Sequence, residues 1–412
     1  MNHEDRFTQR KNPLPDGSAY GRPEHLPDDE LVRVGRGTPC GEWMRRYWQP
    51  FAQSANLSTT PQKVRLLGED LIMFRDGSGR PGLMAPRCIH RGTSLYYGKV
   101  DAQGIRCCYH GWQFDVEGRC IDTPCEPAGS NFKDRVRQPW YPVEERYGLA
   151  FAYMGPPDRK PLLPKWDILE NIAADEKIVA IGPSGIGVGG DDTVSVVPWS
   201  WLQDYENTMD PFHVPILHAS FTEVHFVPEM AIMPDVSYAM NPLGMHYSAH
   251  RTLDDGRELD RVSPCIMPNV RSVPDVQLKA GRASRIGWVV PMDDSHHLLF
   301  HAFRTPKDDG KWPTTRTRRW GEMSENERQR YPGDWEAQEG QGAITLHSEE
   351  HLGASDRGII MLRRLIKQQI RLVQEGGDPQ GLVFDPAQVV QEVGSGNFYR
   401  GATVNAEATS VA

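Results

Sequence analysis

Two short segments of the chain bring cysteine and histidine together in the same order. The first reads Cys88-Ile89-His90-Arg91-Gly92, and the second, with 16 residues between His90 and Cys107, reads Cys107-Cys108-Tyr109-His110-Gly111-Trp112. Thiolates and neutral imidazoles are strong ligands for iron and zinc. Two thiolates on one iron and two imidazoles on the other would hold a 2Fe-2S pair with a raised reduction potential. The glycines allow both loops to close tightly around a metal.

A structural zinc site is the alternative reading of these two loops. Two cysteines and two histidines also suit tetrahedral zinc, but a zinc finger usually takes its two cysteines from one segment and its two histidines from the next. Here each loop supplies one cysteine and one histidine. This pairing favours a cluster with two irons over one zinc ion.

A second group of metal-binding residue types lies between Glu206 and His218. These thirteen residues contain two carboxylates and two histidines. His213 and His218 can reach one metal ion if a helix bends near Pro215. Two imidazoles and one carboxylate form the facial triad of non-haem iron(II) oxygenases, which leaves positions open for O2 and substrate. The residues alone do not identify the carboxylate, because the chain has 55 acidic side chains.

Both groups together resemble the Rieske-type ring-hydroxylating oxygenases, in the branch of phthalate dioxygenase and the aromatic O-demethylases. The resemblance rests on the two loops and on the spacing Asn207-x2-Asp210-x2-His213-x4-His218, and it extends to the entry segments at 37–39 and 46–48. It implies four ligands for a Rieske 2Fe-2S cluster: Cys88, His90, Cys107 and His110. Cys108 stands where relatives commonly carry proline, and the family pattern favours Cys107 as the ligand.

The resemblance also implies the ligands of a mononuclear Fe(II). They are His213 and His218, with Asp356 as the carboxylate just before a long helix that carries Arg363 and Arg364. Glu350 and His351 are less favoured substitutes for Asp356. Asp210 is expected to hydrogen-bond an iron-binding histidine and, across a subunit boundary, a cluster-binding histidine. Asn207 is expected to lie as a polar residue near the metal.

The resemblance further implies an enzyme with partners. It predicts a head-to-tail homotrimer, with a stacked hexamer as a variant, and an NAD(P)H-dependent flavin and iron-sulfur reductase that supplies electrons. The expected reaction uses O2 to dihydroxylate or monooxygenate an aromatic substrate, in particular an aromatic carboxylate. O- or N-demethylation is one alternative, and a Rieske electron-transfer protein without oxygenase activity is another. Arg251, Arg261 and Arg271 are candidates for binding a substrate carboxylate.

The elements that position these residues predict an α+β chain. We expect a loose arm at 1–30, an all-β Rieske domain at 31–156, a catalytic domain at 157–400 with an antiparallel sheet flanked by helices, and a frayed tail at 401–412. The residue patterns predict strands at 64–67, 71–74, 82–85, 149–153, 288–290 and 297–303. A helical apolar period predicts a helix over 357–375, ended by Gly376 and Gly377. Thr38 and Pro39 predict a helix start.

Composition excludes several other classes of protein. The chain has 412 residues, 38% hydrophobic and 25% charged, and a net charge of −9. That charge does not favour nucleic acid or an anionic membrane as a partner. No apolar run is long enough to span a bilayer, and the first residues have no apolar signal segment, so a cytoplasmic protein is expected. Seven cysteines, an odd number, favour metal binding over a disulfide framework.

Overall fold

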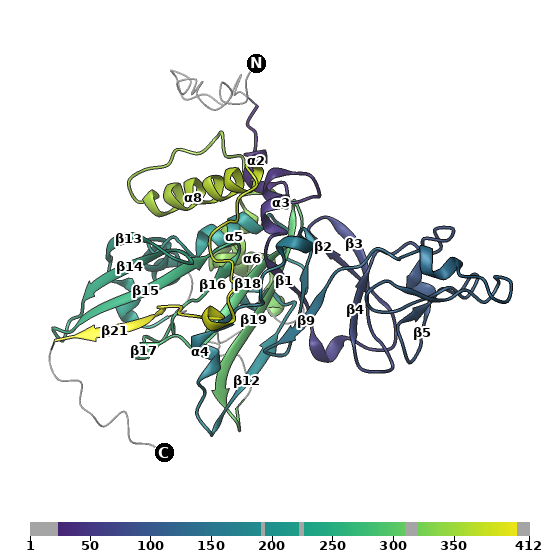
Figure 1. Cartoon of the computed structure of the whole chain (residues 1–412). Helices are drawn as coiled ribbons and strands as arrows, with labels where there is room; N and C mark the ends of the chain where they lie inside the picture. The colour runs from purple at the N-terminus through teal and green to yellow at the C-terminus, as the bar shows by residue number, and fades with distance from the viewer. Residues whose placement is uncertain (1–23, 191–193, 222–225, 310–319, 402–412) are drawn as a thin grey trace.

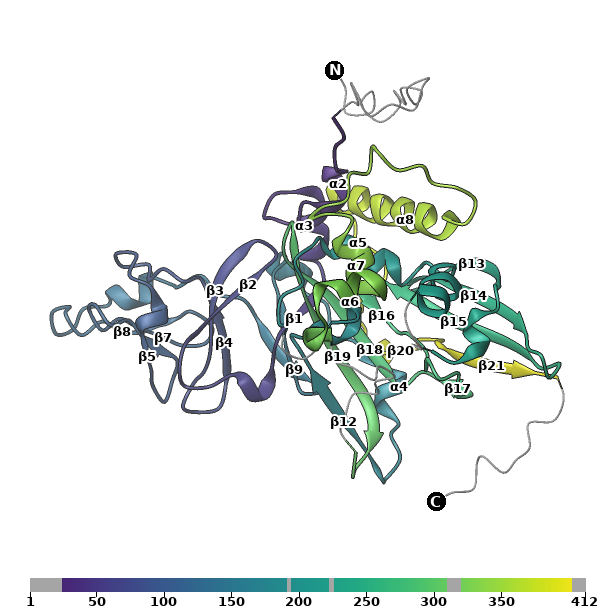
Figure 2. The ribbon, with the colours of Figure 1, turned by 180° about the vertical axis from the view of Figure 1, so that it is seen from behind.

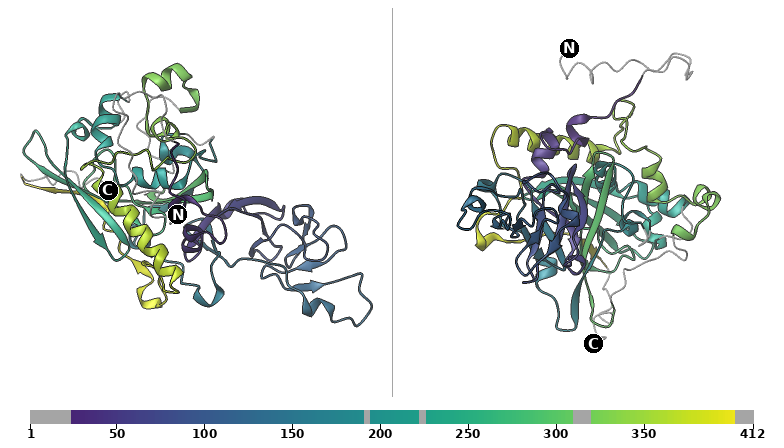
Figure 3. Two further views of the ribbon diagram at one scale, coloured as in Figure 1. Left: turned by 90° about the horizontal axis from the view of Figure 1, so that it is seen from above. Right: turned by 90° about the vertical axis from the view of Figure 1, so that its right-hand side faces the viewer.

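The computed structural model describes residues 24–190, 194–221, 226–309 and 320–401. Most of the predicted N-terminal arm and all of the predicted tail after Gly401 therefore lie outside the described residues. Within the described part, a smaller group of β-sheets projects sideways from a larger body of sheet and helices (Figures 1 and 3). The fold is α+β, as the sequence predicts.

The N-terminal β-structure consists of three small antiparallel sheets. The predicted strands at 64–67, 71–74, 82–85 and 149–153 are all present, with ends shifted by no more than about two residues. The sheets have the orders β1-β10-β9, β2-β3-β4 and β5-β6-β7-β8. Their strands are β1 (Trp48–Gln53), β2 (Gln62–Leu66), β3 (Glu69–Arg75), β4 (Pro81–Met84), β5 (Lys99–Val100), β6 (Ile105–Arg106), β7 (Gln113–Phe114), β8 (Cys120–Asp122), β9 (Val143–Arg146) and β10 (Leu149–Tyr153).

The C-terminal part is built on a nine-stranded sheet. Seven strands follow the order β12-β19-β18-β16-β15-β14-β13, and β17 and β21 pair beside β15. The strands are β12 (Glu176–Ile181), β13 (Asp235–Asn241), β14 (Gly244–Thr252), β15 (Glu258–Ile266), β16 (Val270–Arg271), β17 (Gly281–Arg282), β18 (Arg285–Asp293), β19 (His296–Pro306) and β21 (Gly396–Arg400). A separate parallel pair joins β11 (Lys165–Trp166) to β20 (Val390–Gln391).

Side chains on β14 alternate between two environments. Met245, Tyr247, Ala249 and Arg251 are buried, whereas the residues between them are only partly covered. This period of two shows that one face of the sheet is fully covered. Helix α5 (Trp201–Asn207) packs on β18, and α8 (Arg357–Gln374) contacts β14. The other α-helices in the described residues are α2 (Asp29–Val32), α3 (Pro39–Met44), α4 (Asp167–Glu170), α6 (Glu325–Arg330) and α7 (Asp334–Glu339).

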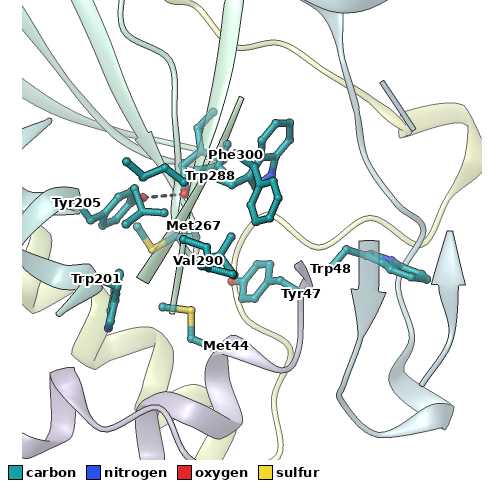
Figure 4. Close-up of a cluster of buried hydrophobic side chains, with 14 of the residues drawn as sticks. Met44, Tyr47, Trp48, Trp201, Tyr205, Met267, Trp288, Val290 and Phe300 are labelled. Carbon is teal, nitrogen blue, oxygen red and sulfur yellow. Dashed lines mark hydrogen bonds between the residues drawn. The ribbon is translucent and has the colours of Figure 1, made fainter. Parts of the chain in front are cut away.

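Residues 29–44 pack on the C-terminal helices as well as against the small sheets, where Gln49 of β1 donates to the Met44 carbonyl. The Thr38 side chain caps α3 by accepting from the Gly41 amide, as predicted, while Glu42 accepts from the amide of Gly37. Helices α2 and α3 lie against α8. Trp43 of α3 lies 6.4 Å from Trp201 of α5 between ring centroids. Helices α3, α5 and α8 therefore contribute to one core, and Figure 4 shows Met44 of α3 and Trp201 of α5 within it.

Helix α8 ties the core to α5. It ends at Gln374, one residue short of the prediction, and Gly376 follows with a φ of +83°, which glycine adopts without strain. Its buried apolar face includes Leu362, Ile366 and Ile370. Arg363 forms ion pairs with Glu206 on α5 and with Glu350. Among the described residues, no helix combines the length and apolarity needed to cross a bilayer.

Candidate cluster and iron sites

The two cysteine–histidine loops adopt the same turn. In the first, the Gly92 amide donates to the carbonyl of Cys88 at 2.8 Å, and in the second, the Gly111 amide donates to the carbonyl of Cys107 at 3.1 Å. Both glycines have positive φ, +77° and +72°, which explains why the sequence needs glycine four residues after each cysteine. Two equivalent turns thus present one cysteine and one histidine each.

Across the two loops, the cysteines lie near each other and the histidines lie near each other. Cys88 and Cys107 are both buried, and burial together with the neighbouring Cys107 raises the pKa of the Cys88 thiol to about 11. The rings of His90 and His110 lie 4.6 Å apart, and His90 stacks on Trp112 at 4.3 Å with nearly parallel planes. A cysteine pair beside a histidine pair fits the two separate irons of a Rieske cluster.

One zinc ion fits this arrangement poorly. Tetrahedral zinc, with bonds of about 2.0–2.3 Å, needs its ligand atoms within about 4 Å of one another. Within the described residues, no three of these four side chains bring ligand atoms within 4.8 Å. The other nearby cysteines play different parts: Cys108 and Cys125 are exposed, and Cys120 is buried with its thiol 3.6 Å from the Asp122 carbonyl. The loops therefore favour the cluster that the sequence predicts.

Gln138 holds the first loop in place. Its side-chain amide donates to the carbonyls of Ala85 and Arg87, both at 2.9 Å, and its oxygen accepts from the amide of Ile89 at 3.0 Å. Gln138 is fully buried. These bonds fix the backbone on either side of Cys88. This role could not be predicted from the sequence, because Gln138 belongs to no motif.

Gln138→Leu is expected to reduce retention of the cluster. The substitution keeps most of the side-chain volume but breaks three hydrogen bonds, and each buried polar group left without a partner costs about 1–3 kcal/mol. Acid-labile sulfide per chain should fall while iron at the second site is retained. Gln62→Leu on β2, which loses one exposed bond to the Asn56 carbonyl, is the matched control. Wild-type sulfide content in Gln138→Leu would contradict this role.

A π-helix presents the two histidines of the second site. The segment Val214–Phe221 adopts this wide helical turn, and His213 immediately precedes it. The i→i+5 hydrogen bonds of a π-helix place residues five apart one above the other, and such turns are frequent at functional sites. His213 and His218 have this spacing, and their rings lie 5.3 Å apart. The bend expected near Pro215 is thus a widened helix rather than a break.

The carboxylate that joins the histidines is Asp334, at the start of α7. Its Oδ1 lies 3.2 Å from Nε2 of His218 and 3.6 Å from Nε2 of His213. Ligand atoms at right angles around an ion with bonds of about 2.1 Å are separated by about 3 Å. In the described part of the chain, only these three side chains form such a group. The donor set fits a mononuclear Fe(II) of the facial-triad type.

The structure does not place Asp356 in this group. Its Oδ2 accepts from the Gly353 amide at 2.6 Å, and the residue precedes the first turn of α8. There its negative charge interacts favourably with the dipole of α8 and its hydrogen bond holds the preceding loop, away from the two histidines. The choice of Asp356 from the resemblance is therefore corrected to Asp334. Glu350 is likewise occupied, by its ion pair with Arg363.

Asp210 and Asn207 both touch the histidine–carboxylate group. Asp210 Oδ2 lies 3.5 Å from Nδ1 of His213, and the Asn207 amide donates to Oδ1 of Asp334 at 3.2 Å (Figure 2 shows α5 beside α7). Burial alone would lower the pKa of His213, but the interaction with Asp210 and the charge of Asp334 raise it overall. At Asp210, burial raises the pKa of the carboxyl group, but the interactions with His213 outweigh this effect and lower the pKa overall. Asp210 thus orients the ring of His213.

The sequence offered one weak signal for Asp334. Pro332-Gly333 directly precedes it, and proline and glycine commonly mark the start of a helix. Glu336 completes the cap by accepting from the Gly333 amide. An acid at the first position of a short helix is common without any metal, so only the tertiary contact with His218 distinguishes it.

Known proteins resemble this chain over most of its length. Residues 47–140 match the family model described as Rieske [2Fe-2S] domain. The chain is 51% identical over 385 residues to the phenoxybenzoate dioxygenase subunit alpha of Ectopseudomonas oleovorans, covering 93% of this chain and 94% of that protein. It is 33% identical over 386 residues to the 5,5'-dehydrodivanillate O-demethylase oxygenase subunit of Sphingobium sp., covering 87% and 83%.

Solved structures agree on the fold. NdmA of Pseudomonas putida CBB5 superposes with a TM-score of 0.58 at 20% identity, covering 82% of this chain and 94% of that protein. The chain belongs to the Rieske non-haem iron oxygenases, as an oxygenase (alpha) subunit. It is an oxidoreductase, the oxygenase component of a multicomponent system, with a Rieske 2Fe-2S cluster and a mononuclear iron as its metal centres.

Proposed function

We propose that this chain binds its catalytic iron through His213, His218 and Asp334 and its cluster through Cys88, His90, Cys107 and His110. The observation that carries the iron site is the convergence of two Nε2 atoms on one carboxylate oxygen. When bound, the iron supplies the activation of O2, and the cluster supplies electrons one at a time.

The proposed substrate is an aromatic ether that carries a carboxylate, and the proposed reaction is dioxygenation. The 51% identity to a protein named phenoxybenzoate dioxygenase supports this class. The apolar neighbours of the histidines support an aromatic ring: Phe226 packs on His218 at 4.4 Å, and Val214 packs with Met230 and Leu259. O-demethylation is the second candidate, because a relative at 33% identity is named an O-demethylase subunit.

Electron delivery is proposed to cross a subunit boundary in a head-to-tail homotrimer, with a stacked pair of such rings as the variant. Asp210 would join His213 to a cluster histidine of the neighbouring subunit, in keeping with its contact at 3.5 Å. His90 and His110 are only partly buried, so their outer edges are accessible for such a contact. An NAD(P)H-dependent reductase is the proposed electron donor.

Product analysis tests the proposal. Purified protein, supplied with a family reductase and NADH, is incubated with 4-phenoxybenzoate under 18O2. Incorporation of both oxygen atoms supports dioxygenation. Formaldehyde release from 4-methoxybenzoate, with one atom incorporated, supports demethylation instead. Oxidation of neither compound by protein with full iron and sulfide would overturn the proposed substrate class.

A further inference from the structure

Arginines line the covered face of the large sheet. Arg251 on β14, Arg261 on β15 and Arg271 on β16 have exposed fractions of only 2%, 4% and 5%. Arg285 on β18 lies on the same face, two residues before Gly287, the cross-strand partner of Arg271. Arginine is almost never fully buried unless an anion or a set of acceptors satisfies it, so each of these side chains needs a partner.

The strand register places Arg251 and Arg261 next to each other. Arg251 is directly opposite Leu259, and Arg261 is directly opposite Ala249. The two arginines are therefore diagonal neighbours on one face, within reach of each other for long side chains. Ala249, the cross-strand partner of Arg261, precedes Arg251 by two residues on the same buried face.

Two of the arginines have their partners within the chain. Arg271 pairs with Asp204 at 2.6 Å and also donates to Thr208 and to the carbonyl of Gly187. Arg261 donates to the carbonyls of Asp275 and Pro274 and to the side chain of Asn397. These contacts explain both side chains as structural.

Arg251 differs from both. Its Nε donates to the carbonyl of Ile232 at 2.9 Å, but its Nη1 is buried and has no hydrogen-bond partner. Burial, opposed by Tyr247 and assisted by the charge of Arg261, lowers the pKa of Arg251 to about 10. A buried cation without a counter-ion costs several kcal/mol. The site is therefore arranged for an anion that residues of the described part of the chain do not supply.

This position is close to the iron-binding segment. Val214, which directly follows His213, packs against the apolar cluster of Met230, Leu259 and Leu278. Leu259 is the cross-strand partner of Arg251. A rigid molecule that reaches from the histidines across this cluster would meet the guanidinium of Arg251.

We propose that Arg251 binds the carboxylate of the substrate, while the apolar cluster holds the aromatic part near His213 and His218. This inference rests on the proposed function and adds the residue that selects aromatic acids over neutral aromatics. A guanidinium offers a planar pair of donors that matches a carboxylate, and Arg251 retains Nη1 for that purpose. Arg261 adds positive charge beside it.

The test is ligand binding by the intact protein with both metal centres loaded. Thermal shift and equilibrium titration compare 4-phenoxybenzoate with its neutral amide, 4-phenoxybenzamide. Arg251→Met is expected to weaken binding of the acid roughly 10- to 100-fold, the effect of one charged hydrogen-bonding group, and to leave binding of the amide within about twofold. Because the substitution removes an unpaired buried charge, the ligand-free variant should melt no lower than wild type.

Two further variants complete the test. Arg251→Lys keeps the charge but not the planar fork, so it should bind the acid with intermediate affinity even if Arg251→Met folds poorly. Arg400→Met on β21, a surface arginine of the same sheet, is the matched control and should behave as wild type. Equal loss of acid and amide, or unchanged acid binding in both Arg251 variants, would overturn the proposal. Wild-type protein that binds neither compound would instead overturn the proposed substrate class.

Discussion

Asp334→Ala is expected to empty the mononuclear iron site and to abolish oxygenation while the 2Fe-2S cluster remains. Loss of a residue that only orients a metal ligand typically costs 10–100-fold in metal affinity or activity, so loss of a ligand itself should cost more than about 100-fold. Iron per chain should fall from about three to about two, and acid-labile sulfide should stay at about two.

The matched control for Asp334 is Asp356→Ala. Asp356 lies at the N-terminal end of α8 and bonds the Gly353 amide, so its loss should cost about 0.3–1 kcal/mol of stability through the helix dipole. Iron content and turnover should remain close to those of wild type. The opposite pattern, with iron lost in Asp356→Ala and kept in Asp334→Ala, would restore the original choice of ligand.

Asp210→Asn is expected to slow turnover roughly 10- to 100-fold with both metal centres in place. The carboxylate orients His213, and in the proposed trimer it also contacts a cluster histidine of the next subunit. An amide has nearly the same shape but lacks the charge that holds the imidazole. The measurement is the rate at which the reduced cluster is oxidised after mixing with substrate and O2 in a single turnover.

Asp235→Asn on β13 is the matched control for Asp210, because its side chain is exposed and makes the same change in charge. It should leave the rate of cluster oxidation unchanged. If Asp210→Asn oxidised its cluster at the wild-type rate with full iron content, Asp210 would have no part in electron transfer.

The two cysteine–histidine turns were predictable because their information is local. Each loop carries its own cysteine, histidine and turn glycine within five residues, so spacing alone defines the geometry. Helix α8 was predictable for a similar reason, since its apolar period extends over many turns. In both cases the neighbours in sequence are also the neighbours in space.

The group of two histidines and one carboxylate was only half predictable. His213 and His218 lie on one segment, but Asp334 comes from a short helix far along the chain. That helix is too short to be predicted from an apolar period. The role of Asp334 depends on a contact between α7 and the π-helix, which no local pattern encodes. The π-helix itself was expected only as a bend, because a wide turn has no residue signature as strong as that of a proline kink. Among the candidate arginines, only the structure could distinguish Arg251, because the unpaired state of its Nη1 depends on tertiary contacts.

The most direct test of this account is the content of iron, zinc and acid-labile sulfide per chain in anaerobically purified protein, together with its visible spectrum. About three irons and two sulfides, with the red-brown colour of a Rieske cluster, is the predicted result. Zinc without sulfide in a colourless protein would contradict it.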